Sequence, residues 1–197
     1  MTFRETEAGL FITHSYKFSP NRSTFIVECP PETWLRAGFD QMSAEETCRR
    51  LAEVFKDDLG GQRLLSNNFV KWLNFPLIKN KRWHHRNIVL LGDALHTAHF
   101  SIGSGTKLAV EDSIALARCF ADHTTVEAAL PAFQRLRKPV VDRFQDAAHK
   151  SLQWLENVKD QLPLEPVPFT YRVLTRSQRV GYNRIKRGDP AFVAQYD

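Results

Sequence analysis

The stretch IVLLGDALHTAHFSIGSGTKLAVEDSIALA, residues 88–117, decides how this sequence is interpreted. Its first residues belong to a short apolar run, 87–91, which is typical of a strand buried on both faces. A Gly-Asp pair at 92–93, a loop, Gly-Ser-Gly at 103–105 and a helix predicted over 107–120 follow. This order is typical of a cradle for a phosphate or a ring, because glycines let a ligand approach the backbone and a helix begins with unsatisfied N–H groups.

Asp93 stands directly after the predicted strand. Sheets of α/β proteins bind ligands at that end, and a carboxylate there can accept hydrogen bonds from ribose or ribityl hydroxyls. A plainer alternative is a tight turn from strand to helix, in which Asp93 caps the backbone and the glycines only permit the turn. Gly-x-Gly alone favours this alternative, so the spacing of the whole segment has to decide.

The whole segment resembles the second FAD motif of aromatic hydroxylases of the para-hydroxybenzoate hydroxylase type. GDALH at 92–96 matches the core of that motif, the glycines of 103–105 follow at matching offsets, and Asp112 lies in the next helix. The match departs at Leu95, where the family usually has alanine, and at Phe100, where it usually has proline.

These departures, together with LTRSQRVGYNRIKRGDPAFV at 174–193, resemble the salicylyl-CoA 5-hydroxylase and anthraniloyl-CoA monooxygenase subfamily. The resemblance spans nearly the whole chain. It implies the C-terminal part of a para-hydroxybenzoate hydroxylase-like FAD-binding fold, of α+β or α/β class. Antiparallel substrate-domain strands would come first, followed by the second flavin motif and long helices.

The resemblance also implies a set of FAD contacts. Asp93 would contact the ribityl or ribose side, and the backbone at 105–107 would face the N1–C2=O edge of the isoalloxazine, which is anionic in reduced flavin. The side chain of a lysine at a helix start more often points to solvent, which is the preferred interpretation of Lys107. The predicted FAD contacts are Gly92, Asp93, Gly103, Ser104, Gly105, Thr106 and Lys107.

The loop between the two glycine turns holds the candidate substrate-side residues, His99, Phe100 and Ser101, where the family's loop passes over the flavin. We expect His96 to be structural, and Asp112 to brace the loop because a buried carboxylate needs hydrogen-bond donors. The two histidines have no carboxylate or cysteine cluster nearby in sequence, so no metal site is predicted. No catalytic acid or base is assigned.

Strands are predicted in the first part of the chain. Residues 10–18 alternate with the period of a strand, and a turn leads to the β-rich segment 24–29. The sequence therefore predicts an antiparallel hairpin that needs further strands as partners. Residues 69–73 are a further candidate strand.

Two more helices are predicted. A capping box at 43–46 starts an amphipathic helix that continues to the Gly-Gly pair at 60–61. A long helix follows over 131–158, with a possible kink at Pro139, and the proline-rich segment 162–168 breaks the pattern.

The chain is divided on this basis into a partial substrate-domain sheet with one helix (1–86), the second FAD motif with its helix (87–130), and C-terminal helices with a basic tail (131–197). None of the nine glycines forms the GxGxxG pattern that seats the FAD pyrophosphate. The alternatives are a truncated chain, a chain that pairs with a separately encoded N-terminal half, or a non-catalytic remnant. We expect the chain alone to bind FAD weakly or not at all.

The basic tail at 172–187 contains no acidic residue. Arg176 and Arg179 are candidates to contact the phosphates of a CoA thioester, although charge runs are more often solvated or domain-contacting surface. A binding role without catalysis is an alternative of another class, with Tyr171 and Tyr182 stacking on single-stranded nucleic acid. It is disfavoured, because these aromatics lack a recognisable RNA-binding arrangement.

Composition fits an ordinary globular protein, with 197 residues, a net charge of +5, 43% hydrophobic and 25% charged residues. No apolar run approaches the roughly 18 residues that span a bilayer, and no signal pattern opens the chain, so a cytoplasmic location is expected. The three cysteines suggest no disulfide framework. The predicted function is FAD-dependent hydroxylation of an aromatic small molecule or aromatic acyl-CoA, with NADH or NADPH and O₂.

Overall fold

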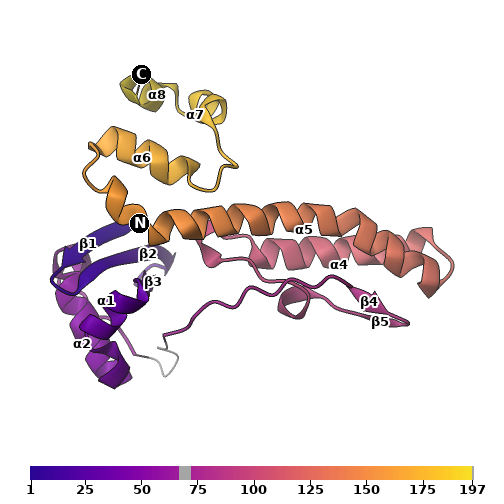
Figure 1. The fold of residues 1–197 in the computed structure, drawn as a ribbon, viewed down its shortest axis with the longest axis horizontal. Coiled ribbons are helices and arrows are strands. Elements are labelled where there is room, and N and C mark those ends of the chain that lie inside the picture. Colours follow the sequence, from indigo (N-terminus) through magenta and orange to yellow (C-terminus); the bar gives the residue numbers. More distant parts are fainter. Residues whose placement is uncertain (67–71, 197) are drawn as a thin grey trace. The chain divides into compact units, whose positions relative to one another are not determined.

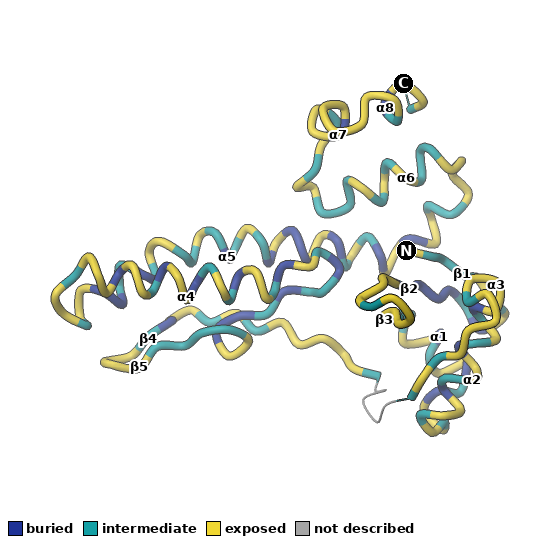
Figure 2. The backbone as a smooth tube through the Cα atoms, turned by 180° about the vertical axis from the view of Figure 1, so that it is seen from behind, coloured by how far each residue is buried: buried dark blue, intermediate teal, exposed yellow. Residues whose placement is uncertain are grey.

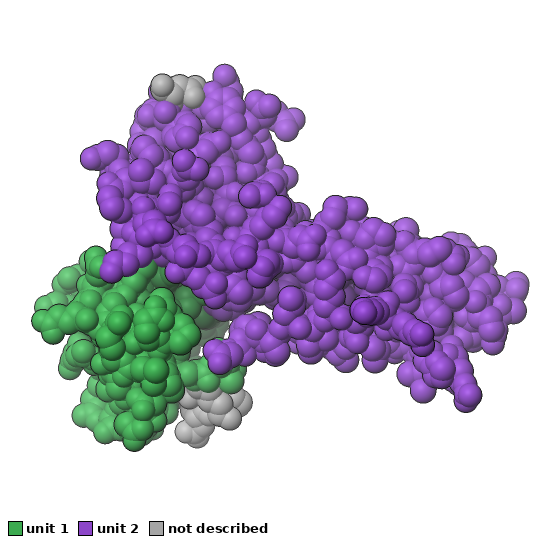
Figure 3. Space-filling model, in the orientation of Figure 1, with its two compact units in different colours: residues 1–73 green, residues 74–197 purple. Residues whose placement is uncertain are grey.

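The protein, in a computed structural model, is described over residues 1–66 and 72–196, and it forms two compact units, residues 1–73 and 74–197 (Figure 3). Each unit has a hydrophobic core of its own. The strand predicted over 69–73 falls mostly on residues outside those described. Large buried side chains of these cores are Phe11, Phe39 and Phe55 in the first unit and Trp83, Leu108 and Phe133 in the second.

The first unit begins with a three-stranded antiparallel sheet of β1 (Thr2–Thr6), β2 (Gly9–Ser19) and β3 (Arg22–Glu28), in the order β1-β2-β3 (Figure 1). The predicted hairpin is confirmed, and β1 supplies the further partner that it needs. Burial is confined to the half of β2 that β1 covers, where Ile12 is 3% exposed.

Short helices follow the sheet: α1 (Pro31–Arg36), the 3-10 turn η1 (Phe39–Gln41) and α2 (Ala44–Val54). The predicted capping box is confirmed. Ser43 Oγ accepts from the backbone N–H of Glu46, and the Glu46 carboxylate accepts from the backbone N–H of Ser43 at 2.8 Å.

The predicted helix to the Gly-Gly pair is not continuous. Phe55 leaves helical geometry, with φ −108° and ψ 23°, and a separate turn, α3 (Lys56–Leu59), follows. The ring of Phe55 is fully buried, 5.3 Å from that of Phe25 in an edge-to-face contact. Burial of this aromatic ring therefore accompanies a break that helical periodicity does not predict.

The second unit contains the run 87–91, which the sequence predicts as a strand buried on both faces. That prediction is wrong. Only β5 (Ile88–Val89) is extended, it pairs with β4 (His84–His85) alone among the described strands, and Ile88 is 64% exposed. The residues after Ile88 pack against the helical core with one face only. The run is therefore buried on one face and not on both.

Two long helices carry this core. α4 (Gly105–Asp122) and α5 (Val126–Glu156) lie side by side (Figures 1 and 2). The Thr125 hydroxyl caps α5, so the helix begins earlier than predicted. It is assigned as one continuous helix through Pro131 and Pro139, because each proline removes one N–H donor without ending the surrounding hydrogen-bond pattern.

The tail after α5 is helical and mainly exposed or half-buried in Figure 2. α6 (Pro166–Thr175) packs on α8 (Pro190–Tyr196), where the rings of Tyr171 and Tyr196 stack with their centres 4.0 Å apart. No helix in residues 1–66 and 72–196 is long and apolar enough to cross a membrane. The tail also contains η4 (Val158–Gln161) and α7 (Tyr182–Gly188).

Candidate functional site

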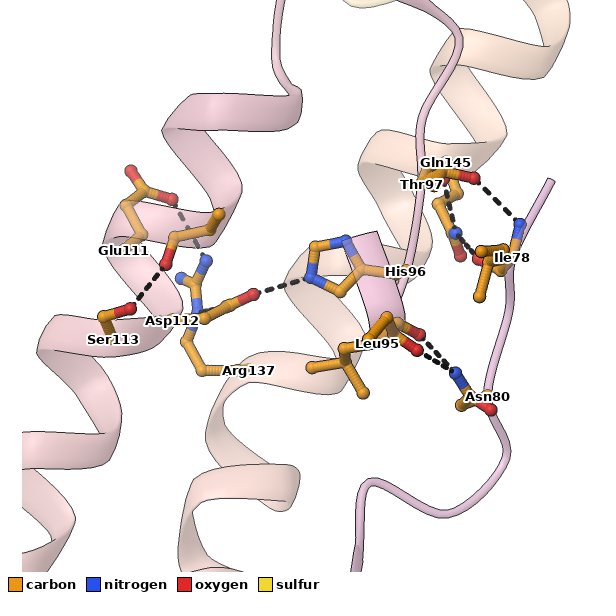
Figure 4. A network of polar contacts seen from close by, with 12 residues as sticks. Ile78, Asn80, Leu95, His96, Thr97, Glu111, Asp112, Ser113, Arg137 and Gln145 are labelled. Atoms are coloured by element: carbon orange, nitrogen blue, oxygen red, sulfur yellow. Dashed lines mark hydrogen bonds and ion pairs between the residues drawn. The ribbon is translucent and has the colours of Figure 1, made fainter. Parts of the chain in front are cut away.

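The Gly-Asp pair begins a turn that the side chain of Asn80 holds by hydrogen bonds. Gly92 has φ +59°, a left-handed conformation that favours glycine, and opens the 3-10 turn η2 (Gly92–Ala94). Asn80 Nδ2 donates to the carbonyl oxygens of the turn's last residue at 3.0 Å and of Leu95 at 2.6 Å (Figure 4). The carboxylate-bearing residue Asp93 stays exposed, and η2 packs against α4.

The second glycine turn leaves the start of α4 open. Gly103 has φ +59°, and an added Cβ at Gly103 or Gly105 would meet no atom within 4 Å. Ser104 precedes the helix, but its hydroxyl donates to the carbonyl oxygen of Ile102 at 3.1 Å instead of capping it. The first turn of α4 contains no acidic residue, and Thr106 and Lys107 in it are exposed, so neither a side-chain cap nor a carboxylate of this turn offsets the positive end of the helix dipole.

Positive charge gathers on the same turn of α4. Lys107 is 56% exposed and ion-paired with Glu111 one turn later, which confirms its solvent-facing position. That hydrogen bond, with a second from Arg137, holds the pKa of the Glu111 carboxyl below its usual value. The Arg179 guanidinium lies 3.9 Å from the centre of the Phe144 ring, and Lys107 Nζ lies 5.4 Å from the same ring.

A buried ionic cluster joins the loop to both long helices (Figure 4). We call it the Asp112 cluster: His96, Asp112 and Arg137. Asp112 is fully buried, with Oδ2 at 2.6 Å from His96 Nε2, and its Oδ1 accepts from Arg137 Nε at 2.6 Å. Trp83 covers the imidazole, with ring centres 5.8 Å apart. The predicted bracing role of Asp112 and the structural role of His96 are both confirmed.

Arg137 was missed by sequence reasoning. A buried carboxylate calls for a cation, but α5 offers Arg135, Arg137 and Lys138 within four positions. Only Arg137 shares the buried side of α5 with Phe133, one helical turn earlier. The spacing of one helical turn between Phe133 and Arg137 was the sequence signal that could have identified Arg137 as the partner of Asp112.

A glutamine in α5 fixes the backbone beside the loop. Gln145 Nε2 donates to the carbonyl oxygens of Ile78 and Thr97, each at 2.8 Å (Figure 4). The Thr97 hydroxyl accepts in turn from the backbone N–H of Ile78 at 2.8 Å. These contacts tie the segment before β4 to the loop, and no periodicity in the sequence predicts them.

A second polar cluster holds the far end of the loop. We call it the Ser151 cluster: His99, Ser101, Ser151 and Arg176. Ser151 Oγ lies 2.9 Å from Ser101 Oγ and accepts from Arg176 Nε at 3.0 Å, and Ser101 Oγ lies 2.9 Å from His99 Nδ1. Ser101 belongs to the 3-10 turn η3 (Phe100–Ile102), and Ser151 is fully buried.

The predicted substrate-side residues are thereby brought together with aromatic side chains. The Phe75 ring lies 5.8 Å from that of His99 and 5.4 Å from that of Phe100, centre to centre. A cavity of about 40 Å³ beside them is lined by the polar residues His99, Thr97, Gln145 and His149 and by apolar side chains. Over residues 1–66 and 72–196, no three His, Cys, Asp or Glu side chains gather in a way that could hold a metal ion.

The two glycine turns place donors and an acceptor on neighbouring elements. The uncapped start of α4 offers N–H donors to an anion, and the Gly-Asp turn packed against α4 exposes a carboxylate that can accept from hydroxyl groups. The chain belongs to the FAD binding domain family, which matches residues 4–148.

Three relatives show how far the likeness extends. Salicyloyl-CoA 5-hydroxylase from Streptomyces sp is 38% identical over 96% of this chain, and protodeoxyviolaceinate monooxygenase from Chromobacterium violaceum is 40% identical over 86%. 3-hydroxy-4-methyl-anthranilyl-[aryl-carrier protein] 5-monooxygenase from Streptosporangium sibiricum is 39% identical over 82%. The matched regions cover 38%, 45% and 42% of these relatives, so the chain spans less than half of their length.

Proposed function

We propose that this chain supplies the second flavin-binding motif of an FAD-dependent monooxygenase that hydroxylates an aromatic ring with NADH or NADPH and O₂. The observation that carries the proposal is the uncapped start of α4 behind the open turn at 103–105, packed against the Gly-Asp turn at 92–93. The names of the three relatives, all hydroxylases or monooxygenases, support it.

In this proposal the chain binds and orients FAD, and the flavin supplies the redox chemistry. The exposed carboxylate of Asp93 would accept hydrogen bonds from ribityl or ribose hydroxyls. The N–H groups at 105–107, with Gly92, Gly103 and Ser104 shaping the two turns, would face the N1–C2=O edge of the ring. Helix N–H groups and Lys107 favour negative charge there. His99, Phe100 and Ser101 would line the substrate side.

A complete FAD site also needs a pyrophosphate cradle. The 197 residues contain no GxGxxG pattern, so we propose that the chain acts as the C-terminal part of the site and that an N-terminal FAD-binding half, on the same or on a separate polypeptide, contributes the cradle. With one of two clamps present, the chain alone would bind FAD weakly or not at all.

A flavin titration tests this proposal. FAD fluorescence is measured with the chain alone and with the chain mixed with the N-terminal half of the Streptomyces salicyloyl-CoA 5-hydroxylase. We expect quenching in the mixture only. Asp93→Ala should lower the affinity for FAD in the mixture roughly tenfold, because a hydrogen bond to a charged group is lost. The matched control is Asp122→Ala, an exposed carboxylate at the other end of α4.

Each other outcome has a definite meaning. Tight stoichiometric FAD on the chain alone would overturn the need for a second half. Absence of binding in both samples would overturn the flavin role in favour of a non-catalytic remnant. Equal weakening by the variants of Asp93 and Asp122 would remove the assignment of Asp93.

The substrate is proposed to be an aromatic acyl thioester, since the names of two relatives refer to a CoA ester and an aryl-carrier protein. Arg176 and Arg179 stay the predicted phosphate contacts. Of the two, Arg179 fits better, because it is exposed, whereas Arg176 donates several hydrogen bonds within the protein. In the Streptomyces relative, replacing the residue equivalent to Arg179 with alanine should raise the KM for the CoA ester and leave kcat unchanged. An unchanged KM would remove the assignment.

A further inference from the structure

We propose that Arg176 is a positioning residue for the flavin-binding loop, so that the C-terminal tail is a working part of the flavin site. This inference rests on the proposed function. It concerns how the tail sets the direction of the N–H groups at the start of α4, which no comparison with known proteins assigns.

The first step is the geometry of the guanidinium. Arg176 directly follows α6, and three of its nitrogens donate to three different oxygens. Nε donates to Ser151 Oγ at 3.0 Å, Nη1 to the carbonyl oxygen of Val173 at 2.6 Å, and Nη2 to the carbonyl oxygen of Ser101 at 2.7 Å. A rigid planar fork therefore joins the tail, α5 and the loop, a task that a lysine ammonium performs less well.

The second step is burial. Ser151 is 0% exposed and Ser101 is 8% exposed. Water therefore has little access to the serine oxygens that Arg176 satisfies, and loss of the guanidinium would leave buried acceptors without this donor. The loop would relieve that penalty by moving.

The third step connects this contact with the cofactor. Three residues separate Ser101 from Gly105, the first residue of α4, and one of them is Gly103 in the left-handed conformation. A displaced Ser101 carbonyl would turn this short link and with it the first N–H groups of α4. A shift of about 1 Å in a positioning contact is enough to impair a reaction strongly.

An independent contact brings the same part of the tail to an aromatic ring of α5 that the start of α4 also approaches. Three residues after Arg176, the guanidinium of Arg179 covers the Phe144 ring, which Lys107 Nζ also approaches. The tail thus makes two contacts near the start of α4, one by hydrogen bonds to Ser101 and Ser151 and one by a cation–π contact with Phe144.

The test compares Arg176→Gln with Arg172→Gln. Arg172 is an exposed cation on α6 and borders the same surface pocket of about 360 Å³ as Arg176, so the variants lose equal charge at neighbouring places. Hydrogen–deuterium exchange is measured on peptides covering 98–106 and, as an internal reference, 110–122. We expect Arg176→Gln to speed exchange of the loop peptide by roughly tenfold, and neither variant to change the reference.

A flavin readout separates positioning from mere folding. FAD is added to each variant with the N-terminal half described above, and its affinity and visible absorption spectrum are recorded. We expect Arg176→Gln to weaken FAD binding by about tenfold and to shift the spectrum towards that of free FAD. Arg176→Lys should restore part of the affinity, and Arg172→Gln should match the unaltered chain.

Three results would overturn the inference: unchanged loop exchange in Arg176→Gln, faster exchange with an unaltered flavin spectrum and affinity, or equal effects of the two glutamine variants. If the unaltered chain binds no FAD in the mixture, the proposed function fails instead. The exchange measurement still decides in that case whether Arg176 holds the loop.

Discussion

The Asp112 cluster and the Ser151 cluster both tie the same loop to α5, but they do so with different chemistry. In the first, a fully buried carboxylate bridges an imidazole and a guanidinium within the core of α4 and α5. In the second, the Ser151 hydroxyl and the Ser101 backbone carbonyl oxygen accept hydrogen bonds from an arginine of the tail. The comparison suggests that the first cluster sustains the fold and the second sets the conformation of one loop.

The largest effect is expected at the carboxylate. Asp112→Asn removes the only negative charge of its cluster and leaves Arg137, 11% exposed, without a buried counter-ion. Breaking a buried pair costs about 3–5 kcal/mol, which is the upper bound here because Glu111 stays 3.1 Å from Arg137. Urea unfolding followed by circular dichroism should show a loss of this size, and a loss below about 1 kcal/mol would contradict the assignment of the fold to this cluster.

A smaller effect is expected in the second cluster. Ser151→Ala removes a fully buried hydroxyl that accepts from Arg176 and contacts Ser101, which should cost about 1–3 kcal/mol and loosen the loop. Ser113→Ala is the matched control, since the exposed Ser113 hydroxyl donates only to a carbonyl of its own helix and its loss should stay within about 0.5 kcal/mol. Equal unfolding free energies for the two variants would remove the distinction.

The smallest effect concerns the exposed partner of Arg137. Glu111 and Asp112 are neighbours that bind the same arginine, yet the Glu111 side chain is 36% exposed. Because Lys107 and Arg137 lower its pKa, the ionised carboxylate contributes stability above its usual value of 4.5, and that contribution is lost as the pH falls through the folded pKa.

Glu111→Gln should therefore cost less than about 1 kcal/mol at pH 7, and the difference from the unaltered chain should shrink towards pH 3. Urea unfolding at the two pH values measures it. A difference that grows on acidification would show that Glu111 is not held in its ionised form by these cations.

Sequence patterns predicted the parts of the fold that depend on local rules. The capping box at 43–46, the hairpin and the helix α4, which extends two residues beyond its predicted bounds at each end, follow from hydrogen bonding and periodicity within a few residues. The buried role of Asp112 followed from its place on an apolar helical stripe. The turn geometry at 92–93 and 103–105 agrees with the glycine positions, while the FAD contacts inferred there stay predictions.

The parts that were missed depend on partners far away in the chain. The bond between Arg176 and Ser101 spans 75 residues, and that between Gln145 and Ile78 spans 67. Nothing distinguishes Arg176 from the other basic residues of the tail until the chain is folded. The run at 87–91 shows the converse error, since an apolar run does not state how many of its faces will be covered.

The order of contacts along α5 has a consequence for how this loop can vary in length. Arg137 is linked to His96 through Asp112, Gln145 binds Thr97, and Ser151 binds Ser101. Successive residues of α5 are thus connected to successive residues of the loop. The helix advances about 21 Å from its first to its last contact, whereas five loop residues extend at most about 18 Å. The loop therefore has no spare length between positions 96 and 101, and a deletion there would break at least one of these contacts with α5. Shortening of this loop, natural or engineered, should be poorly tolerated.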